Sequence, residues 1–267
     1  MLRNIIGGIA IGIANVIPGV SGGTMMVILG IFNRMMDAIS GVFKRENLNR
    51  KDDIIFIVQV LIGAAVGRIG FAKILEVLFE YCPTQTIYWF IGLIAFSIPL
   101  FLKGEMSGQK LAITPFICGL AIIFVLEFLN PGEGKTVVNP DFPPLSATLF
   151  IKMVIIGAVS GATMIMPGVS GSMVLLILGE YYLFKSYLAL GFMAIGIAIG
   201  IVISAKLCSY FTRTHKAGFL SLILGLIVAS SLVLIPFDVV YDFNLIITSL
   251  VAFAFGGVIV FGLSKIQ

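Results

Sequence analysis

Two copies of a short motif rich in Pro, Gly and Ser interrupt apolar stretches of the chain. The first is IPGVSGGTMMVILG at residues 17–30, and the second is MPGVSGSMVLLILG at residues 166–179. Proline has no N–H to donate and clashes with the preceding turn, so each motif ends a helix. Its serine is a natural N-cap for the next helix. The free amides of such a helix N-terminus carry about half a positive charge, which suits a phosphate or a carboxylate.

The candidate anion-binding residues come from both copies. They are Pro18, Gly19, Ser21, Gly22, Gly23 and Thr24 in the first copy and Pro167, Gly168, Ser170, Gly171 and Ser172 in the second. Thr24 has no counterpart hydroxyl, because Met173 takes its place in the second copy. The alternative is a hinge or a tight helix crossing, since Gly, Ala and Ser also line helix interfaces in membranes. The repetition of the motif favours ligand binding.

A single arginine adds a charge deep in an apolar segment. Arg68 lies near the middle of the apolar stretch 54–80, and an ionisable residue at such a depth is a candidate functional residue. Its guanidinium suits a phosphate, which it can bind through two parallel hydrogen bonds. The alternative is an internal ion pair with Glu76 or Glu127.

Four further polar residues are secondary candidates. Asn15 precedes the first motif, where its amide could satisfy loose backbone groups or contact a ligand. Lys73 and Lys206 occupy equivalent positions in two related segments, and each could receive an anionic head group or reach a membrane interface. Glu76 lies three residues after Lys73, so a local ion pair is the alternative to a functional role.

The composition indicates which elements must position these residues. The chain has 267 residues, of which 59% are hydrophobic and 11% charged, whereas a soluble domain carries about 25% charged residues. A polytopic membrane protein with one transmembrane domain, residues 1–267, is therefore predicted. The net charge of +4 indicates loops that set orientation and predicts no nucleic-acid partner. The expected spans are 54–80, 87–102, 111–129, 187–211, 218–236 and 245–264.

The second PGVSG copy belongs to a longer internal repeat. GAAVGRIGFAK at 63–73 matches GIAIGIVISAK at 196–206, and IGLIAFS at 91–97 matches LGLIVAS at 224–230. These collinear matches predict two homologous halves, residues 1–130 and 147–267. Small residues spaced four apart are typical of helix packing, and we assign that role to Gly8, Gly12, Gly63, Gly67, Gly157, Gly161, Gly196 and Gly200.

The distribution of charge decides between two topologies. If the interrupted segments, near 2–40 and 148–185, are re-entrant hairpins, the second half is inverted and most Lys and Arg residues share one side. If each crosses the bilayer once, the basic loop 44–51 lies outside. We predict an all-α polytopic membrane protein of two inverted-topology repeats, each a broken or re-entrant helical hairpin plus three transmembrane helices. Both termini are then cytoplasmic. Fully spanning hairpins give the same charge pattern and stay open.

Enzymatic chemistry is not expected from this chain. Catalysis of that kind usually needs a positioned acid, base or nucleophile with its partners, and the single histidine, His215, lies in a short polar loop. Cys82, Cys118 and Cys208 are scattered without metal-ligand spacing, so we expect neither a metal nor another cofactor. No GxxxxGK[ST] motif occurs, which leaves a coupling ion (H+ or Na+) or a lipid gradient as the driving force.

The opening GGIAIGIANVIPGVSGGT, together with the second PGVSG, resembles the polyprenyl-phosphate transporter (PopT) family. The resemblance covers essentially the whole chain. It implies a translocase that returns undecaprenyl phosphate from the outer to the inner leaflet of the bacterial cytoplasmic membrane, for recycling of the lipid carrier in cell-wall synthesis. It would work by alternating access, with the phosphate at the paired PGVSG tips. Composition and spacing alone indicate only an inverted-repeat transporter of an anionic or polar substrate. The alternative is an ion-coupled secondary transporter of a small soluble anion.

Overall fold

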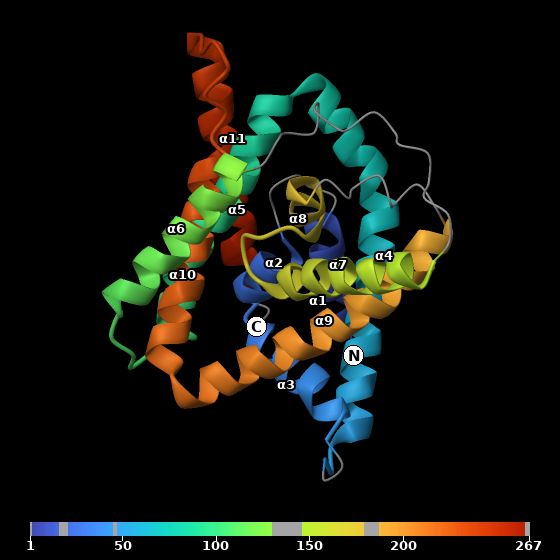
Figure 1. The fold of residues 1–267 in the computed structure, drawn as a ribbon. Coiled ribbons are helices and arrows are strands. Elements are labelled where there is room, and N and C mark those ends of the chain that lie inside the picture. The colour runs from blue at the N-terminus through green and yellow to red at the C-terminus, as the bar shows by residue number, and fades with distance from the viewer. Residues whose placement is uncertain (1, 16–20, 45–46, 130–145, 179–186, 265–267) are drawn as a thin grey trace.

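The computed structural model describes residues 2–15, 21–44, 47–129, 146–178 and 187–264. These residues form α-helices joined by turns, and no strand occurs among them (Figure 1). The all-α prediction is confirmed. The helices are α1 (Leu2–Ala14), α2 (Gly22–Ile28), α3 (Phe32–Val42), α4 (Arg50–Tyr81), α5 (Pro83–Lys103), α6 (Ile113–Leu129), α7 (Ala147–Ile165), α8 (Gly171–Ile177), α9 (Tyr187–Thr214), α10 (Lys216–Val233) and α11 (Phe243–Ser264).

Six of the described helices are long and apolar enough to cross a membrane: α4, α5, α7, α9, α10 and α11. Crossing the hydrocarbon takes about 20 apolar residues, and these helices supply the polytopic membrane protein that the composition predicts. One member of the set differs from the prediction. Helix α7, which was expected as a hairpin arm, has 19 residues, whereas α6, an expected span, has 17.

Glycines let the helix pairs approach to backbone contact. A Cβ at Gly63 of α4 would lie 2.2 Å from the Ile5 carbonyl oxygen of α1, and a Cβ at Gly196 of α9 would lie 2.1 Å from the Val154 carbonyl oxygen of α7. All eight glycines assigned to packing approach a carbonyl oxygen of a partner helix in this way. Their predicted role in helix crossings is confirmed, because any larger residue would force the backbones apart.

The arm after the first PGVSG motif is broken a second time. Helices α2 and α3 meet at a bend of 118°, whereas one continuous arm was expected. The bend lies at Gly30, whose φ is +61°. Its N–H donates to the Val27 carbonyl (3.0 Å) and the Ile31 N–H donates to the Met26 carbonyl (3.0 Å). These two bonds form a Schellman motif, which ends a helix at a glycine of left-handed conformation.

Polar side chains tie α3 to three neighbouring segments. The Arg34 guanidinium binds the Asp53 carboxylate of α4 at 2.5 Å, and the Arg213 guanidinium of α9 binds the Asp37 carboxylate at 2.9 Å. The Asn33 side-chain amide donates to the Glu105 carboxylate, which lies just after α5. Helix α3 therefore links elements from both halves of the chain at one end of the molecule.

Replacement of Glu105 by Gln is expected to stabilise the protein at neutral pH. Burial raises the pKa of the Glu105 carboxyl, although the Asn33 hydrogen bond and the charge of Lys216 oppose the shift. Because the pKa is higher in the folded state than in the unfolded state, the protonated Glu105 side chain favours folding. This contribution to stability is fully present below the unfolded-state pKa and is lost as the pH rises through the folded-state pKa. Glu105→Gln should therefore raise the melting temperature at pH 7 by about 2 °C and leave it unchanged at about pH 4. Glu80→Gln, at an exposed position, is the control for the change of residue type.

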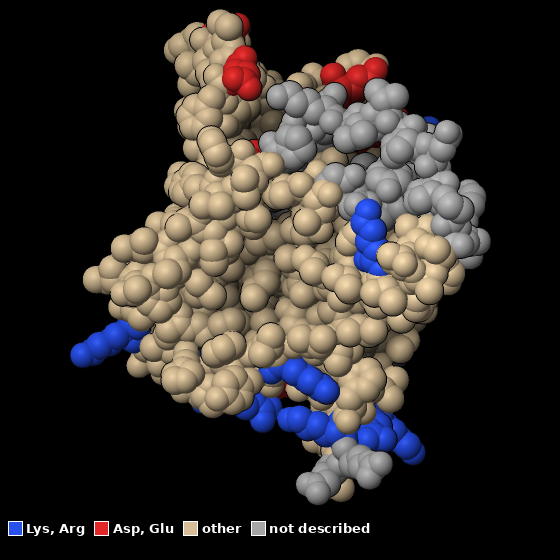
Figure 2. All heavy atoms as spheres, in the orientation of Figure 1, with Lys and Arg blue, Asp and Glu red and all other residues tan. Residues whose placement is uncertain are grey.

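Charge is distributed unevenly along the molecule. On the face shown in Figure 2, most Lys and Arg side chains lie at the end where α3 and the C-terminal end of α9 are found in Figure 1, and the visible clusters of Asp and Glu lie at the opposite end. Basic residues collect on the cytoplasmic side of membrane proteins. The uneven charge gives the two ends of the bundle different electrostatic environments.

Candidate functional site

The two PGVSG segments meet inside the molecule. The Gly168 N–H of the second segment donates to the Thr24 hydroxyl oxygen (2.8 Å) and to the Ser21 hydroxyl oxygen (3.0 Å) of the first. The two hydroxyl oxygens are 3.1 Å apart, and the Ser21 hydroxyl donates to the Met166 carbonyl (3.1 Å). We call this set of contacts between Ser21, Thr24, Met166 and Gly168 the tip latch.

Local backbone geometry positions the Ser21 and Thr24 hydroxyls. Ser21 has extended backbone angles and is the N-cap of α2, where its side chain accepts from the Thr24 N–H (3.2 Å). This is the capping role that the sequence predicts. All seven residues of α2 are buried. The Ser21 and Thr24 hydroxyls are therefore held in a fixed orientation and face the second segment.

Two glycines make the crossing of the tips possible. A Cβ at Gly23 would lie 2.2 Å from the Ile165 carbonyl oxygen. Gly168 has a φ of +80°, a conformation that L side chains rarely adopt, and a Cβ there would lie 2.9 Å from the Leu226 carbonyl oxygen. Both positions need glycine, the first for close approach and the second for backbone conformation as well.

The second segment is built differently from the first. Ser170 is the N-cap of α8, but its side chain makes no capping hydrogen bond. Instead, the Ser160 hydroxyl of α7 donates to the Gly171 carbonyl (3.1 Å). Pro167 is buried beside the tip latch. The predicted site residues Pro18 and Gly19 lie outside the described residues, as does the side chain of Ser172.

The tips are closed in this conformation. Ser21 is 3% exposed and Thr24 is 1% exposed, and the Gly168 N–H already has two hydroxyl acceptors. A bound anion would have to replace those acceptors. In the first turn of α2, Gly22 and Gly23 carry N–H groups that have no acceptor within the helix, so the arrangement provides donors for an anion once the tips separate.

The charged candidates lie away from this contact. Arg68 is exposed on α4, and no ion pair among the described residues joins it to Glu76 or Glu127. Lys73 and Glu76 lie further along α4, and the described part of the chain has no ion pair between them.

Two further candidates make local contacts. The Lys206 ammonium lies 5.9 Å from the centre of the Phe43 ring, in a cation–π contact. The Asn15 amide covers Gly22, because a Cβ there would lie 2.8 Å from the Asn15 side-chain oxygen. Among the described candidates, the structure thus brings together residues of the two motifs and leaves Arg68 and the two lysines elsewhere.

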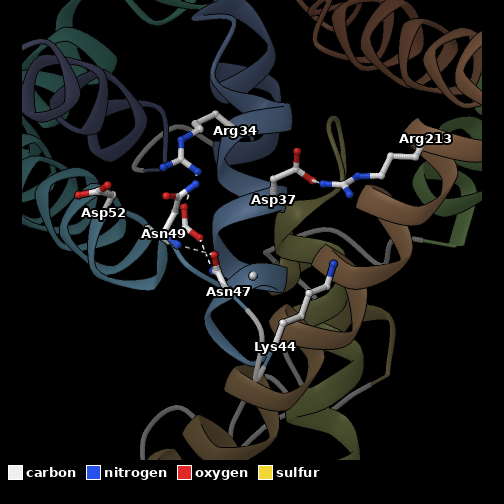
Figure 3. A pocket seen from close by; sticks show the side chains of 9 residues that line it. Arg34, Asp37, Lys44, Asn47, Asn49, Asp52 and Arg213 are labelled. Atoms are coloured by element: carbon white, nitrogen blue, oxygen red, sulfur yellow. Dashed lines mark hydrogen bonds and ion pairs between the residues drawn. The ribbon is translucent and has the colours of Figure 1, made fainter.

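A second polar region was not predicted as a site. A cavity of about 790 Å³ opens between α3, the start of α4 and the end of α9 (Figure 3). We call it the basic-end pocket, and it is lined by Arg34, Asp37, Gly41, Lys44, Asn47, Asn49, Asp52, Asp53 and Arg213. The sequence shows only Arg34 and Asp37 one helical turn apart, a spacing that also occurs on exposed helix surfaces, whereas in the structure they pair with Asp53 and Arg213.

Metal ligation is not indicated in the part of the chain that the structure describes. No group of three or more His, Cys, Asp or Glu side chains there is placed to hold a metal ion. The polar chemistry available at the two regions is therefore hydrogen bonding from backbone amides and hydroxyls at the tips, and from guanidinium, ammonium and amide groups in the basic-end pocket.

Comparisons with known proteins agree with the resemblance carried by the motifs. The polyprenyl-phosphate transporter of Staphylococcus aureus (strain NCTC 8325 / PS 47) is 30% identical over 237 residues, which cover 79% of this chain and 78% of the relative. The polyprenyl-phosphate transporter of Vibrio cholerae serotype O1 is 28% identical over 183 residues, which cover 66% of this chain and 55% of that relative. No solved structure gives a significant match.

A family model gives the assignment directly. The model described as undecaprenyl phosphate translocase-like matches residues 11–190, which include both PGVSG segments and the helices between them. This match spans well over half of the chain. The chain therefore belongs to the undecaprenyl phosphate translocase-like family.

Proposed function

We propose that this protein carries undecaprenyl (polyprenyl) phosphate from the outer to the inner leaflet of the bacterial cytoplasmic membrane, where the lipid carrier is reused in cell-wall synthesis. The main observation behind the proposal is the tip latch, in which a backbone N–H of one motif binds two hydroxyls of the other. The curated relatives carry the name polyprenyl-phosphate transporter, which supplies the class of lipid.

The latch suggests how a phosphate would be bound. A phosphate monoester carries a charge of about −1.5 to −2 near neutral pH, and hydrogen bonds to such a group are stronger than those to a neutral hydroxyl. When the tips separate, the Gly168 N–H would exchange its hydroxyl acceptors for phosphate oxygens. The Ser21 and Thr24 hydroxyls and the first amides of α2 would donate to the same group. The prenyl tail would stay in the lipid.

Alternating access requires two halves that can exchange roles, and we propose that residues 1–130 and 147–267 are such halves in inverted orientation. Helix pairing supports this: α5 packs on α11, and the equivalent helix of the second half, α10, packs on α6. The glycines that allow these contacts, Gly92 and Gly225, are 133 positions apart, the spacing of the sequence repeat. In addition, the start of α4 and the end of α9 both contact α3, so these equivalent helices run in opposite directions there. The basic end is then cytoplasmic, together with both termini.

Arg68 has a different role in this proposal. Its exposed position on a membrane-spanning helix suits an encounter with a phosphate that arrives from the lipid side, before the group reaches the tips. Lys73 and Lys206 would act at the interfaces at either end of such a path. We propose an ion gradient (H+ or Na+) or the lipid gradient as the driving force.

A reconstituted flipping assay tests the function. Proteoliposomes should move a fluorescent polyprenyl phosphate between leaflets, whereas protein-free vesicles should not. Arg68→Ala should slow flipping about tenfold, because a hydrogen bond to a charged group is lost, and Arg68→Lys should retain most of the rate. Uptake of inorganic phosphate without flipping of the lipid would contradict the proposal and favour a transporter of small soluble anions.

A further inference from the structure

The basic-end pocket brings cationic side chains from three segments to one space. Arg34 comes from α3, Lys44 follows α3, and Arg213 comes from the last turn of α9. In Figure 3 the Asp37 and Arg213 side chains face each other between α3 and α9. The Lys44 side chain lies below them in this view and extends upward toward that pair. A cavity of about 790 Å³ is large enough for a phosphate group.

Two of the three carboxylates that line the pocket hold the two guanidiniums in place. Asp53 accepts from Arg34 (2.5 Å) and from the Asn47 amide (2.8 Å). Asp37 accepts from Arg213 (2.9 Å) and from the Ser209 hydroxyl (2.6 Å). In this way each guanidinium is oriented by a carboxylate. A phosphate also presents negatively charged oxygens, so it could replace the carboxylate as the partner of a guanidinium.

Two cationic groups keep binding capacity beyond these pairs. Lys44 forms no ion pair in the described part of the chain, and Arg213 uses one nitrogen for Asp37 while its side chain remains 62% exposed. Arg34 is further oriented by the Phe56 ring, whose centre lies 5.0 Å from the guanidinium carbon. Guanidinium and ammonium groups arranged on opposite sides of a cavity can contact several oxygens of one phosphate.

The pocket also lies beside the ends of two candidate membrane-spanning helices. It is lined by residues at the start of α4, which begins at Arg50, and at the end of α9, which ends at Thr214. The ends of spanning helices are where lipid head groups are expected. A smaller cavity of about 390 Å³ shares Arg34 with it and reaches Gly30, the residue of the α2–α3 bend. The tip latch thus lies at the start of segment 21–44 and the basic-end pocket toward its end, with the bend between α2 and α3 between them.

We propose that the basic-end pocket binds the phosphate monoester of the transported lipid on the side where that lipid is released. Arg213, Arg34 and Lys44 contact the phosphate, and Asp37 is the carboxylate that the phosphate displaces from Arg213. The inference rests on the proposed function, since a lipid phosphate must be present to occupy the pocket. Loss of the Asp37–Arg213 bond would remove one of the polar contacts between α3 and α9, while the hydrogen bond from Ser209 to Asp37 would remain.

Binding can be measured at the pocket itself. Asn49→Cys places a thiol in the lining, in a background with Cys82, Cys118 and Cys208 replaced by Ser or Ala. The rate of its modification by a negatively charged thiol reagent is then followed while farnesyl phosphate, inorganic phosphate or farnesol is added. Farnesyl phosphate should slow the reaction at the lowest concentration, inorganic phosphate only at higher concentration, and farnesol not at all.

The two partners of one ion pair provide the decisive comparison. Arg213→Gln should weaken protection by farnesyl phosphate roughly tenfold or more, because a hydrogen bond between charged groups is lost. Asp37→Asn should strengthen it several-fold, because Arg213 is released while the introduced amide oxygen can still accept from the Ser209 hydroxyl. Lys51→Gln removes one charge from the exposed first turn of α4, outside the lining, and should change protection less than about twofold.

Each other outcome has a definite meaning. If Arg213→Gln and Asp37→Asn weaken protection alike, or if neither alters it, the ion pair only ties α3 to α9 and the proposal is wrong. Equal protection by inorganic and farnesyl phosphate would overturn the assignment to a lipid. Flipping by the wild type without protection of the introduced thiol rejects this inference alone, whereas protection without flipping rejects the proposed function and keeps the pocket as an anion site.

Discussion

Gly23→Ala is expected to destabilise the protein strongly, and Gly70→Ala is expected to leave it intact or slightly stabilised. A Cβ at position 23 would lie 2.2 Å from the Ile165 carbonyl oxygen and 2.9 Å from the Met166 carbonyl carbon. These are backbone atoms, which cannot rotate away as a side chain can. Overpacking of this kind costs about 1–3 kcal/mol and sometimes more, and separation of the two tips would also break the bonds of Gly168.

The matched control isolates the contact from the change of residue type. Gly70 lies on α4, and among the described residues no side chain or neighbouring helix comes within 4 Å of the place that a methyl group would take there. Ala at this position therefore gains about 0.5–1 kcal/mol of helix preference. Thermal unfolding in detergent should move in opposite directions for the two variants. Equal melting temperatures would mean that the tips do not touch as described.

Much of the fold follows from local signals in the sequence. Apolar length predicts the long helices, since about 20 such residues are needed to cross a bilayer. The glycines at 63, 67, 196 and 200 predict where helices cross, because only small residues permit backbone contact. The bend at Gly30 was missed although the glycine was visible. A glycine inside an apolar stretch is compatible with both a packed helix and a helix end, and only the tertiary contacts decide.

The candidate site was predicted in part, for a similar reason. Capping by Ser21 is a local event and could be read from the motif. The meeting of Ser21 with Gly168 is a contact between residues 147 positions apart, which the repeat suggests but cannot place. Arg68 was selected for its depth along a helix, yet the face on which a side chain lies depends on how α1 packs against α4. The ion pairs of the basic-end pocket depend on α9 reaching α3, which no local pattern predicts.

The double variant Ser21→Ala, Thr24→Val is expected to lose both the closed tips and transport. It removes both hydroxyl acceptors of the Gly168 N–H and leaves that donor buried without a partner. The cost of an unsatisfied buried donor is about 1–3 kcal/mol, which corresponds to a shift of roughly 5- to 150-fold in the ratio of closed to open molecules. Flipping of polyprenyl phosphate should fall at least as far, because the same hydroxyls are proposed to bind the phosphate.

Thr163→Val is the control for this loss. The Thr163 hydroxyl donates to the Ser160 carbonyl within α7 at 2.8 Å, so the variant removes a hydroxyl from the same region without touching the contact between the tips. It should keep its melting temperature and its flipping rate close to those of the wild type. If the double variant behaved like Thr163→Val, the hydroxyls would be dispensable for both closure and transport. The first motif supplies both hydroxyl acceptors for the Gly168 N–H, and the second motif has Met173 at the position equivalent to Thr24. The loss should therefore not be rescued by introducing a hydroxyl at position 173.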